Sequence, residues 1–187
     1  MRIALFATTT AFVLLGACGG PHANSSNTTA ANTGNSASPP QVAAGSNADP
    51  DMTPVSADQA KTVMHERHEG MESIGKTTKT LKRELDSSSP DTAAVHAAAA
   101  QMADLSSQAT GWFRAGTGPD VGKTGAKPEI WQNPQDFAVK VHAFQQAAKA
   151  FNVAVMSGDG PSIKTKFGEL GQSCQSCHDK YRSEMHH

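Results

Sequence analysis

The sequence predicts an all-α protein whose folded part is an antiparallel four-helix bundle. Apolar residues recur at alternating steps of four and three in four separate segments of the 187-residue chain. These segments are joined by two short breaks and one long loop, and none of them shows the period-two alternation that is typical of a strand. We expect this bundle to occupy residues 57–187.

The first two helices have clear start signals. Ser56-Ala57-Asp58-Gln59 fits a capping box, which predicts that the first helix begins there. Its apolar seam is Ala60, Met64, Arg67, Met71, Ile74, Thr78, Leu81 and Leu85. Ser89-Pro90 reads as an N-cap followed by a proline at the first helical position, so we expect the second helix to begin at this point. Its seam is Val95, Ala98, Met102, Leu105, Ala109 and Trp112.

Residues 111–133 are rich in glycine and have no helical period, which predicts a long loop. Asn133-Pro134 repeats the start signal for a third helix. Its seam is Phe137, Val141, Phe144, Ala148, Phe151 and Val155. Gly158-Asp159-Gly160-Pro161 then breaks the chain before the last helix. The last seam is Ile163, Phe167, Leu170, Cys174, Cys177 and Tyr181.

The N-terminus is typical of an export signal. A basic start and a short apolar run fill residues 1–17, which are too few for a membrane-spanning helix. Leu15-Gly16-Ala17-Cys18 resembles the bacterial lipobox, so we expect a lipoprotein signal peptide and a lipidated Cys18. The alternative is an ordinary signal peptide in which Cys18 is incidental. Both place the mature protein outside the cytoplasm, and Gly19 after Cys18 favours anchoring to the outer rather than the inner membrane.

Residues 18–56 are expected to form a disordered linker after the lipidated cysteine. Small and polar residues dominate this segment, and it contains no Lys or Arg. Such a composition cannot bury enough apolar surface to offset the entropy lost on ordering. The segment would therefore tether the folded domain to a membrane.

Charge and cysteine content exclude several classes of protein. The formal net charge is −1, so the sequence lacks the basic footprint of a nucleic-acid-binding protein. Three cysteines are too few for a disulfide-stapled scaffold. No nucleophile–base pair or pair of carboxylates stands out, so we expect that the protein is not an enzyme.

Cys174-Gln175-Ser176-Cys177-His178 is the C-x-x-C-H pattern by which c-type haem is attached. Two thiols three residues apart share one helical face and can add to the two haem vinyl groups, while the adjacent imidazole can bind iron. Zinc is an alternative, but it usually takes four Cys or His ligands and no second paired cluster is present. A redox dithiol would follow a strand and open a helix, whereas this motif lies late in a helical pattern.

Three stretches resemble the class II cytochromes c, the cytochrome c-prime family. They are residues 174–182 near the C-terminus, Arg67-His68-Glu69-Gly70-Met71, and Ala126-Lys127-Pro128-Glu129-Ile130-Trp131 together with Phe137. The late position of the haem motif distinguishes this family from the class I cytochromes c. The resemblance covers roughly residues 57–185. It implies a four-helix bundle with one haem c attached covalently near the C-terminal helix.

The resemblance also implies roles for single residues. Cys174 and Cys177 would be the thioether links and His178 the proximal iron ligand. Arg182, one turn after His178, would lie near the haem edge. Arg67 would pair with a haem propionate, although an arginine that snorkels at a bundle end is the alternative.

Trp131 is expected to pack against the porphyrin or, equally, within the loop core. Met71 occupies the family's distal position, where a methionine binds iron in one branch of the family. Gly70 and Gly75 near it indicate room for a macrocycle. The alternatives are that Met71 only fills space in the seam, as Met64 does, or that His68 is the ligand.

The sequence thus predicts a periplasmic, lipid-anchored cytochrome that carries one electron by Fe(III)/Fe(II) cycling. Its partner would be a redox protein of the envelope respiratory chain, and the family suggests a homodimer formed through the first two helices. The alternative function is a five-coordinate haem protein that binds NO or CO. A non-haem metal or redox thiol module is the third reading.

Overall fold

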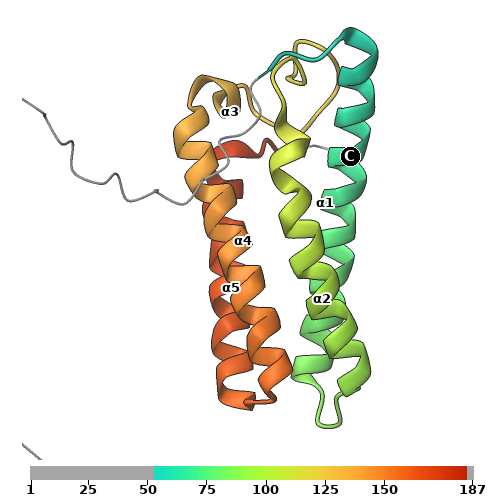
Figure 1. Ribbon diagram of the computed structural model, residues 1–187, viewed down its shortest axis with the longest axis vertical. Coiled ribbons are helices and arrows are strands. Elements are labelled where there is room, and N and C mark those ends of the chain that lie inside the picture. Colours follow the sequence, from blue (N-terminus) through green and yellow to red (C-terminus); the bar gives the residue numbers. More distant parts are fainter. Residues whose placement is uncertain (1–52, 185–187) are drawn as a thin grey trace, which may run out of the picture. The chain divides into compact units, whose positions relative to one another are not determined.

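The computed structural model describes residues 53–184, which fold into four long helices and two short ones. The long helices are α1 (Ala57–Asp86), α2 (Thr92–Gln108), α4 (Pro134–Ser157) and α5 (Gly160–Tyr181). A 3₁₀ helix, η1 (Ala109–Phe113), continues α2, and α3 (Glu129–Gln132) is a single turn before α4. Figure 1 shows α1 beside α2 and α4 beside α5.

The predicted all-α bundle is confirmed. The residues that the structure describes contain no strand, and the nearest approach to one is an isolated antiparallel bridge between Ala126 and Arg182. None of the helices within residues 53–184 is long and apolar enough to cross a membrane.

The capping box predicted for α1 is present. The Gln59 amide donates to Ser56 Oγ at 3.3 Å, and the Ser56 amide donates to Gln59 Oε1 at 3.0 Å. The start predicted for α2 is wrong by two residues, because Asp91 rather than Ser89 is its N-cap. Asp91 Oδ1 accepts from the Ala94 amide at 3.1 Å, and a carboxylate at an N-cap also interacts favourably with the helix dipole.

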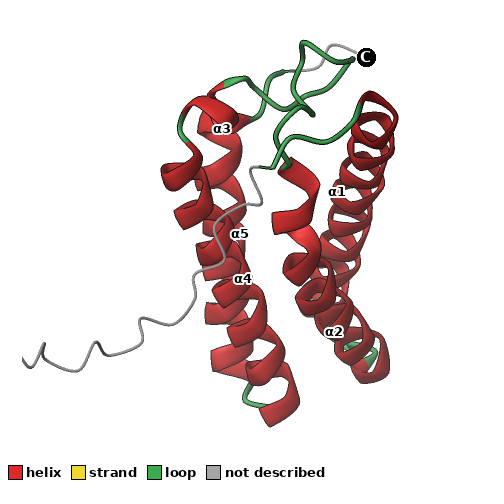
Figure 2. Cartoon of the chain, turned by 45° about the horizontal axis from the view of Figure 1, so that its top comes forward, coloured by secondary structure: helices red, strands yellow, loops and turns green. Residues whose placement is uncertain are grey.

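The long loop contains more structure than the sequence predicts. The first residues of the predicted loop, as far as Phe113, belong to the 3₁₀ helix η1, and α3 occupies residues 129–132. A single turn is too short to show a helical period, so α3 left no signal in the sequence. Figure 2 shows this loop at the end of the bundle where α5 ends, while the short α1–α2 and α4–α5 turns lie at the other end.

The last residues of the linker predicted over residues 18–56 are described by the structure, and one of them contacts the long loop. Residues 1–52 lie outside the described part of the chain, but the amide of Val55 donates to the carbonyl oxygen of Ala115 at 3.2 Å. Gly116 lies beside Val55 with φ +79°, and a Cβ there would come within 3.6 Å of the Val55 carbonyl oxygen. Residues just before α1 therefore belong to the domain and contact its loop.

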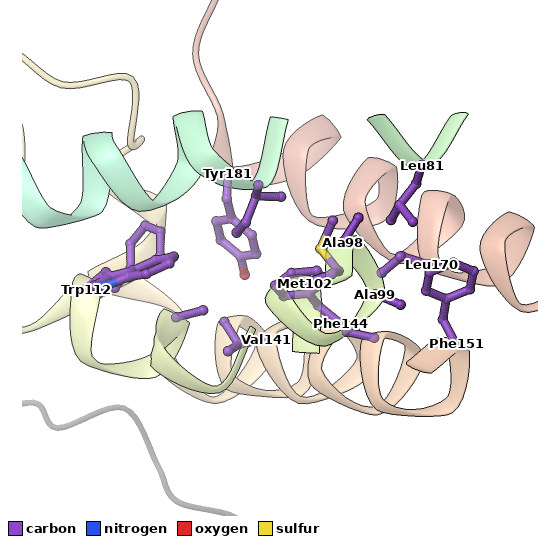
Figure 3. Packing of buried hydrophobic residues seen from close by; sticks show 14 of the residues in the cluster. Leu81, Ala98, Ala99, Met102, Trp112, Val141, Phe144, Phe151, Leu170 and Tyr181 are labelled. Atoms are coloured by element: carbon purple, nitrogen blue, oxygen red, sulfur yellow. The ribbon is translucent and has the colours of Figure 1, made fainter. Parts of the chain in front are cut away.

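The core is built from the predicted seams. Every predicted seam residue of α4 is buried, and so are all those of α2 and η1 except half-buried Leu105. Leu81 of α1 and Leu170 of α5 are also buried, and Figure 3 shows both near Phe151 and Ala99. These apolar residues fill the core in the half of the bundle nearest the α1–α2 and α4–α5 turns.

The bundle packs unevenly around its circumference. α1 packs extensively against α2, α2 against α4, and α4 against α5, whereas α5 and α1 make few close backbone approaches. The apolar seams of α1 and α5 are accordingly only partly buried. The half-buried seam residues are Met64, Met71, Thr78 and Leu85 of α1, and Ile163, Phe167, Cys174 and Cys177 of α5. The α1–α5 side is therefore the side of the bundle that a further apolar group can complete.

Candidate functional site

The C-x-x-C-H segment occupies the last two turns of α5. Cys174 and Cys177 are free thiols, half-buried against the apolar core, and His178 next to them is exposed. Burial raises the pKa of Cys174 and raises that of Cys177 to about 11. Both thiols are therefore protonated at neutral pH. A redox dithiol needs the opposite, a thiolate stabilised near a helix N-terminus.

Within residues 53–184, the same two cysteines do not belong to a group of side chains that could hold a metal. Among the described residues, the only group of three His, Cys, Asp or Glu side chains with ligand atoms within 4.8 Å of one another is His68, Glu69 and Glu72. All three are exposed, and none is near the cysteines in the sequence. The geometry thus favours neither the zinc reading nor the redox thiol reading. The predicted rival ligand His68 lies in solvent.

His178 has the protonation state that an iron ligand needs. Although His178 is exposed, desolvation by the neighbouring protein atoms, followed by the positive charge of Arg182, lowers its pKa. A neutral imidazole has a free nitrogen lone pair for a metal. Arg182 itself is exposed and follows the end of α5, where its backbone bridges to Ala126. The expected place of Arg182 near the haem edge stays a prediction.

Met71 and the α5 motif lie at the same end of the bundle. Leu81 and Leu170 serve as a reference, since both are buried where α1 and α5 meet the closed half of the core. With a rise of ~1.5 Å per residue, Met71 lies ~15 Å from Leu81 along α1, and His178 lies ~12 Å from Leu170 along α5. Both helices border the weakly packed side, so this side carries a thioether on one helix and the C-x-x-C-H motif on the other.

Arg67 is a buried cation one turn before Met71. Its side chain donates four hydrogen bonds: to the Trp112 carbonyl at 3.2 Å, to Thr117 Oγ1 at 3.1 Å, to the Thr117 carbonyl at 3.0 Å and to Thr124 Oγ1 at 2.9 Å. No carboxylate among the described residues pairs with it, and burial lowers its pKa to about 10. A buried charge without a counter-ion is costly, so an anion delivered by a bound group would complete this site.

Trp131 lies in the same cluster as Arg67. The Arg67 guanidinium lies 5.8 Å from the Trp131 ring and 5.3 Å from the Phe113 ring. The indole nitrogen of Trp131 donates to the Arg114 carbonyl at 3.0 Å. Trp131 is therefore held beside the buried cation, and its packing against a porphyrin stays a prediction.

The interpretation of Gly70 needs correction. A Cβ on Gly70 would lie 2.4 Å from two ring atoms of Trp112, so this glycine makes room for the indole ring rather than for a macrocycle. Figure 3 shows Trp112 at the end of the buried cluster, beside α1. A Cβ on Gly75 would meet no atom within 4 Å, so the structure shows no neighbour that requires a glycine there.

Sequence reasoning missed the partners of Arg67. Thr117 and Thr124 lie in a segment without periodicity, and nothing in their sequence context distinguishes them from solvent-exposed loop threonines. It also missed Asp136, whose carboxylate accepts hydrogen bonds from Tyr181 and Lys180 at the end of α5. The only signal was the polar Arg67 on an otherwise apolar seam, which indicates that polar partners must exist.

A four-helix bundle with a C-x-x-C-H motif at the end of its last helix defines a c-type haem protein. The family model described as Cytochrome C' matches residues 62–182, and the chain belongs to the cytochrome c' family. As a member it carries one covalent haem c. The open α1–α5 side, the half-buried cysteines and the unpaired Arg67 cation fit this group.

Individual relatives agree with this assignment. The chain is 34% identical to cytochrome c' of Allochromatium vinosum over 121 residues, which are 63% of this chain and 78% of the relative. It is 32% identical to that of Rhodospirillum rubrum over 124 residues, 66% and 79% of the two chains. A further relative, cytochrome c' of Alcaligenes xylosoxydans, is 37% identical over 73 residues, 39% of this chain and 56% of the relative.

Solved structures show the same fold. Cytochrome c' from Shewanella frigidimarina superimposes with a TM-score of 0.62 at 33% identity, covering 67% of this chain and 97% of the other. A cytochrome c' with a ligand-controlled dimer dissociation gives 0.61 at 30% identity, covering 71% and 100%. The nitric oxide complex of a leucine-to-isoleucine variant from Alcaligenes xylosoxidans gives 0.60 at 26% identity, covering 71% and 100%.

Proposed function

We propose that this cytochrome c' family member is a one-electron carrier of the bacterial envelope and not an enzyme. The observation that carries this proposal is the arrangement of the α1–α5 side. Met71 on α1 and the C-x-x-C-H motif on α5 border the same weakly packed side at the same end of the bundle. A group bound there can have one axial ligand from each helix.

In this proposal each residue has a defined task. Cys174 and Cys177 attach the haem by thioether bonds, and His178 supplies the proximal nitrogen ligand. Arg67, one turn before Met71, supplies the cation that pairs with a propionate. The bound haem supplies the reversible Fe(III)/Fe(II) couple. Arg182 and Trp131 lie beside His178 and Arg67 respectively and shape the polar surroundings of the site.

We propose Met71 as the distal ligand. A thioether sulfur is a suitable soft axial ligand, and His/Met ligation raises the reduction potential. Met71 is half-buried and packs against the core, so its sulfur is held near the site rather than moving freely in solvent. An electron carrier with two protein ligands needs little rearrangement when its charge changes.

The second candidate function is binding of NO or CO at an iron that has only His178 as a protein ligand. It is favoured by the solved relatives, whose structures include nitric oxide complexes. The flexible methionine side chain would in this case stand beside the ligand rather than bind iron. The two functions use the same residues and differ only in the role of Met71.

A spectroscopic experiment separates these functions. A pyridine haemochrome assay first establishes covalent haem, and its failure would end both proposals. Spectra of the ferric protein, and of the ferrous protein with and without CO, are then recorded for the wild type and for Met71→Leu. Electron carriage with Met71 bound predicts a low-spin ferric spectrum that becomes high-spin in Met71→Leu. A high-spin wild type that binds CO promptly supports the alternative.

Met64→Leu is the matched control for this experiment. Met64 lies two turns before Met71 on the same seam and is also half-buried, but it packs near Gly122 of the long loop. Its loss is expected to leave the spectrum of the wild type unchanged. A change of equal size in both variants would show that a general loss of packing, and not ligation, causes the effect.

We further propose that residues 1–17 direct export, that Cys18 is acylated and that the following segment tethers the domain to the outer membrane from the periplasmic side. Cys18 and nearly all of the tether lie outside the described residues. Labelling cells with a radioactive fatty acid tests this proposal, since label in the wild type and none in Cys18→Ser is expected. A homodimer and an envelope redox protein are the proposed partners.

A further inference from the structure

We propose that Asp136 is a positioning residue for His178 and acts through Tyr181. This inference rests on the proposed function, in which His178 binds the haem iron. Asp136 lies in the first turn of α4, far from the haem motif in the sequence. Its role follows from its contacts at the end of α5.

Tyr181 links Asp136 to the turn that carries His178. Its hydroxyl donates to Asp136 Oδ2 at 2.5 Å, and its ring meets that of Phe137 edge-on with centroids 5.2 Å apart. Tyr181 is 2% exposed, so its ring is enclosed by neighbouring residues. Figure 3 shows it inside the cluster of buried residues.

The hydroxyl contact sets the rotation of α5 about its own axis. Cys174, Cys177 and Tyr181 are spaced by three and four residues, so they share one face of the helix. His178 is the neighbour of Cys177 and makes a fixed angle with this face. Any rotation that moves the Tyr181 hydroxyl away from Asp136 therefore turns the His178 imidazole as well.

Separate contacts set the position of α5 along its axis. The Lys127 amide donates to the Tyr181 carbonyl at 3.0 Å, and the Ser183 amide donates to the Gly125 carbonyl at 2.9 Å. These main-chain bonds survive any side-chain substitution at Asp136. Loss of the carboxylate contact is thus expected to loosen the rotation of the last turn without detaching it.

Asp136 is suited to this task by its place on α4. Its carboxylate is near the N-terminus of that helix, where the unpaired amides favour a negative charge. Lys180 adds a second contact at 2.9 Å, but both members of that pair are 48% exposed, so it contributes little. The buried Tyr181 hydroxyl is the principal partner.

Ferric EPR of the purified holoprotein tests the proposal, because its g values report the axial ligand field at iron whether or not Met71 is bound. The variants are Asp136→Leu, Tyr181→Phe and both together. Each single change removes the same hydrogen bond, since leucine offers no acceptor, but only the first removes a charge. Asp86→Leu is the matched control, since it breaks a more exposed ion pair with Lys82 at the C-terminal end of α1.

We expect the same shift of g values in both single variants, no further shift in the double variant and none in Asp86→Leu. Spectra of both single variants that match the wild type would overturn the positioning role, and so would a shift in Asp136→Leu alone, which would be an effect of charge. His178→Gly separates a failure of the positioning role of Asp136 from a failure of the proposed function. If it leaves the g values unchanged, His178 is not the ligand and both proposals fail.

Discussion

Arg67 of α1 and Thr117 of the long loop are joined by two hydrogen bonds across 50 residues of sequence. One guanidinium nitrogen donates to the Thr117 hydroxyl and the other to its carbonyl oxygen, and Thr117 is fully buried. The Thr117 hydroxyl donates in turn to the Arg114 carbonyl at 2.7 Å. The Arg67 guanidinium, which we propose pairs with a haem propionate, therefore also holds the loop against α1.

Arg67→Met tests both roles. Methionine keeps most of the apolar volume but leaves the buried acceptors of Thr117 and the half-buried hydroxyl of Thr124 without their donor, which is expected to lower the free energy of unfolding by about 1–3 kcal/mol. Loss of a nearby positive charge also disfavours the ferrous state, so the reduction potential should fall. Denaturant unfolding and potentiometric titration of the holoprotein measure the two effects.

Arg83→Met is the control for Arg67→Met. Arg83 lies on the same helix but is 68% exposed and pairs only with Glu84. Its loss should change neither the stability nor the potential noticeably. A normal potential in Arg67→Met, together with the expected loss of stability, would show that Arg67 holds the loop but does not pair with the haem.

Gly70→Ala tests the close approach of Trp112 to α1. The new Cβ would lie 2.4 Å from the indole ring, so the ring or the helix must move, at a cost of about 1–3 kcal/mol. Gly75→Ala is the control, because a Cβ there meets nothing and alanine stabilises a helix by about 1 kcal/mol relative to glycine. Thermal unfolding of both variants should show shifts of opposite sign.

A double-mutant cycle sharpens this prediction. Trp112→Phe shortens the side chain that faces Gly70, so Gly70→Ala should cost less in that background than in the wild type. Equal costs in the two backgrounds would mean that the Gly70 effect does not come from Trp112.

The helices could be predicted because packing and sequence share a period. Met102, Phe144 and Phe151 are buried, and they were placed on seams by steps of four and three alone. The start of α2 was missed because Ser89 and Asp91 are both residue types that suit an N-cap. Which of the two caps the helix depends on the path of the chain between α1 and α2, and no local sequence pattern indicates that path.

The polar part of the site could be predicted only in part. The C-x-x-C-H motif and the odd position of Arg67 are visible in the sequence, but the contacts of Arg67 with Thr117 and Thr124 are made across 50 and 57 residues through an irregular loop. Such contacts depend on tertiary structure and have no local pattern. The hydrogen bond between Val55 and Ala115 was hidden for the same reason.

Acid should remove the contribution of Asp136 to stability. The hydrogen bond from Tyr181, followed by that from Lys180, lowers the pKa of Asp136 below its ordinary value of 3.8. A lowered pKa in the folded state means that the stabilisation is present above the ordinary value and is lost as the pH falls through the folded one. Asp136→Asn should therefore be less stable than the wild type at pH 7, and the two should converge in strong acid.

Urea unfolding at a series of pH values measures this difference. Asp86→Asn serves as the control, because the ion pair that Asp86 forms with Lys82 is exposed. A gap between wild type and Asp136→Asn that stays constant from neutral pH to strong acid would contradict the proposed linkage. It would indicate that the amide disturbs packing around Tyr181 instead.

The cysteines should be unreactive in folded protein that carries no haem. Burial raises the pKa of Cys177 from 9.0 to about 11, which reduces its thiolate fraction at neutral pH about 100-fold. In protein produced without haem attachment, with Cys18→Ser and Cys174→Ala, iodoacetamide should alkylate Cys177 about 100-fold more slowly than a free cysteine. Mass spectrometry gives the rate, and the same protein in denaturant should react at the ordinary rate. Fast alkylation of the folded protein would show that Cys177 is not held against the core as the structure describes.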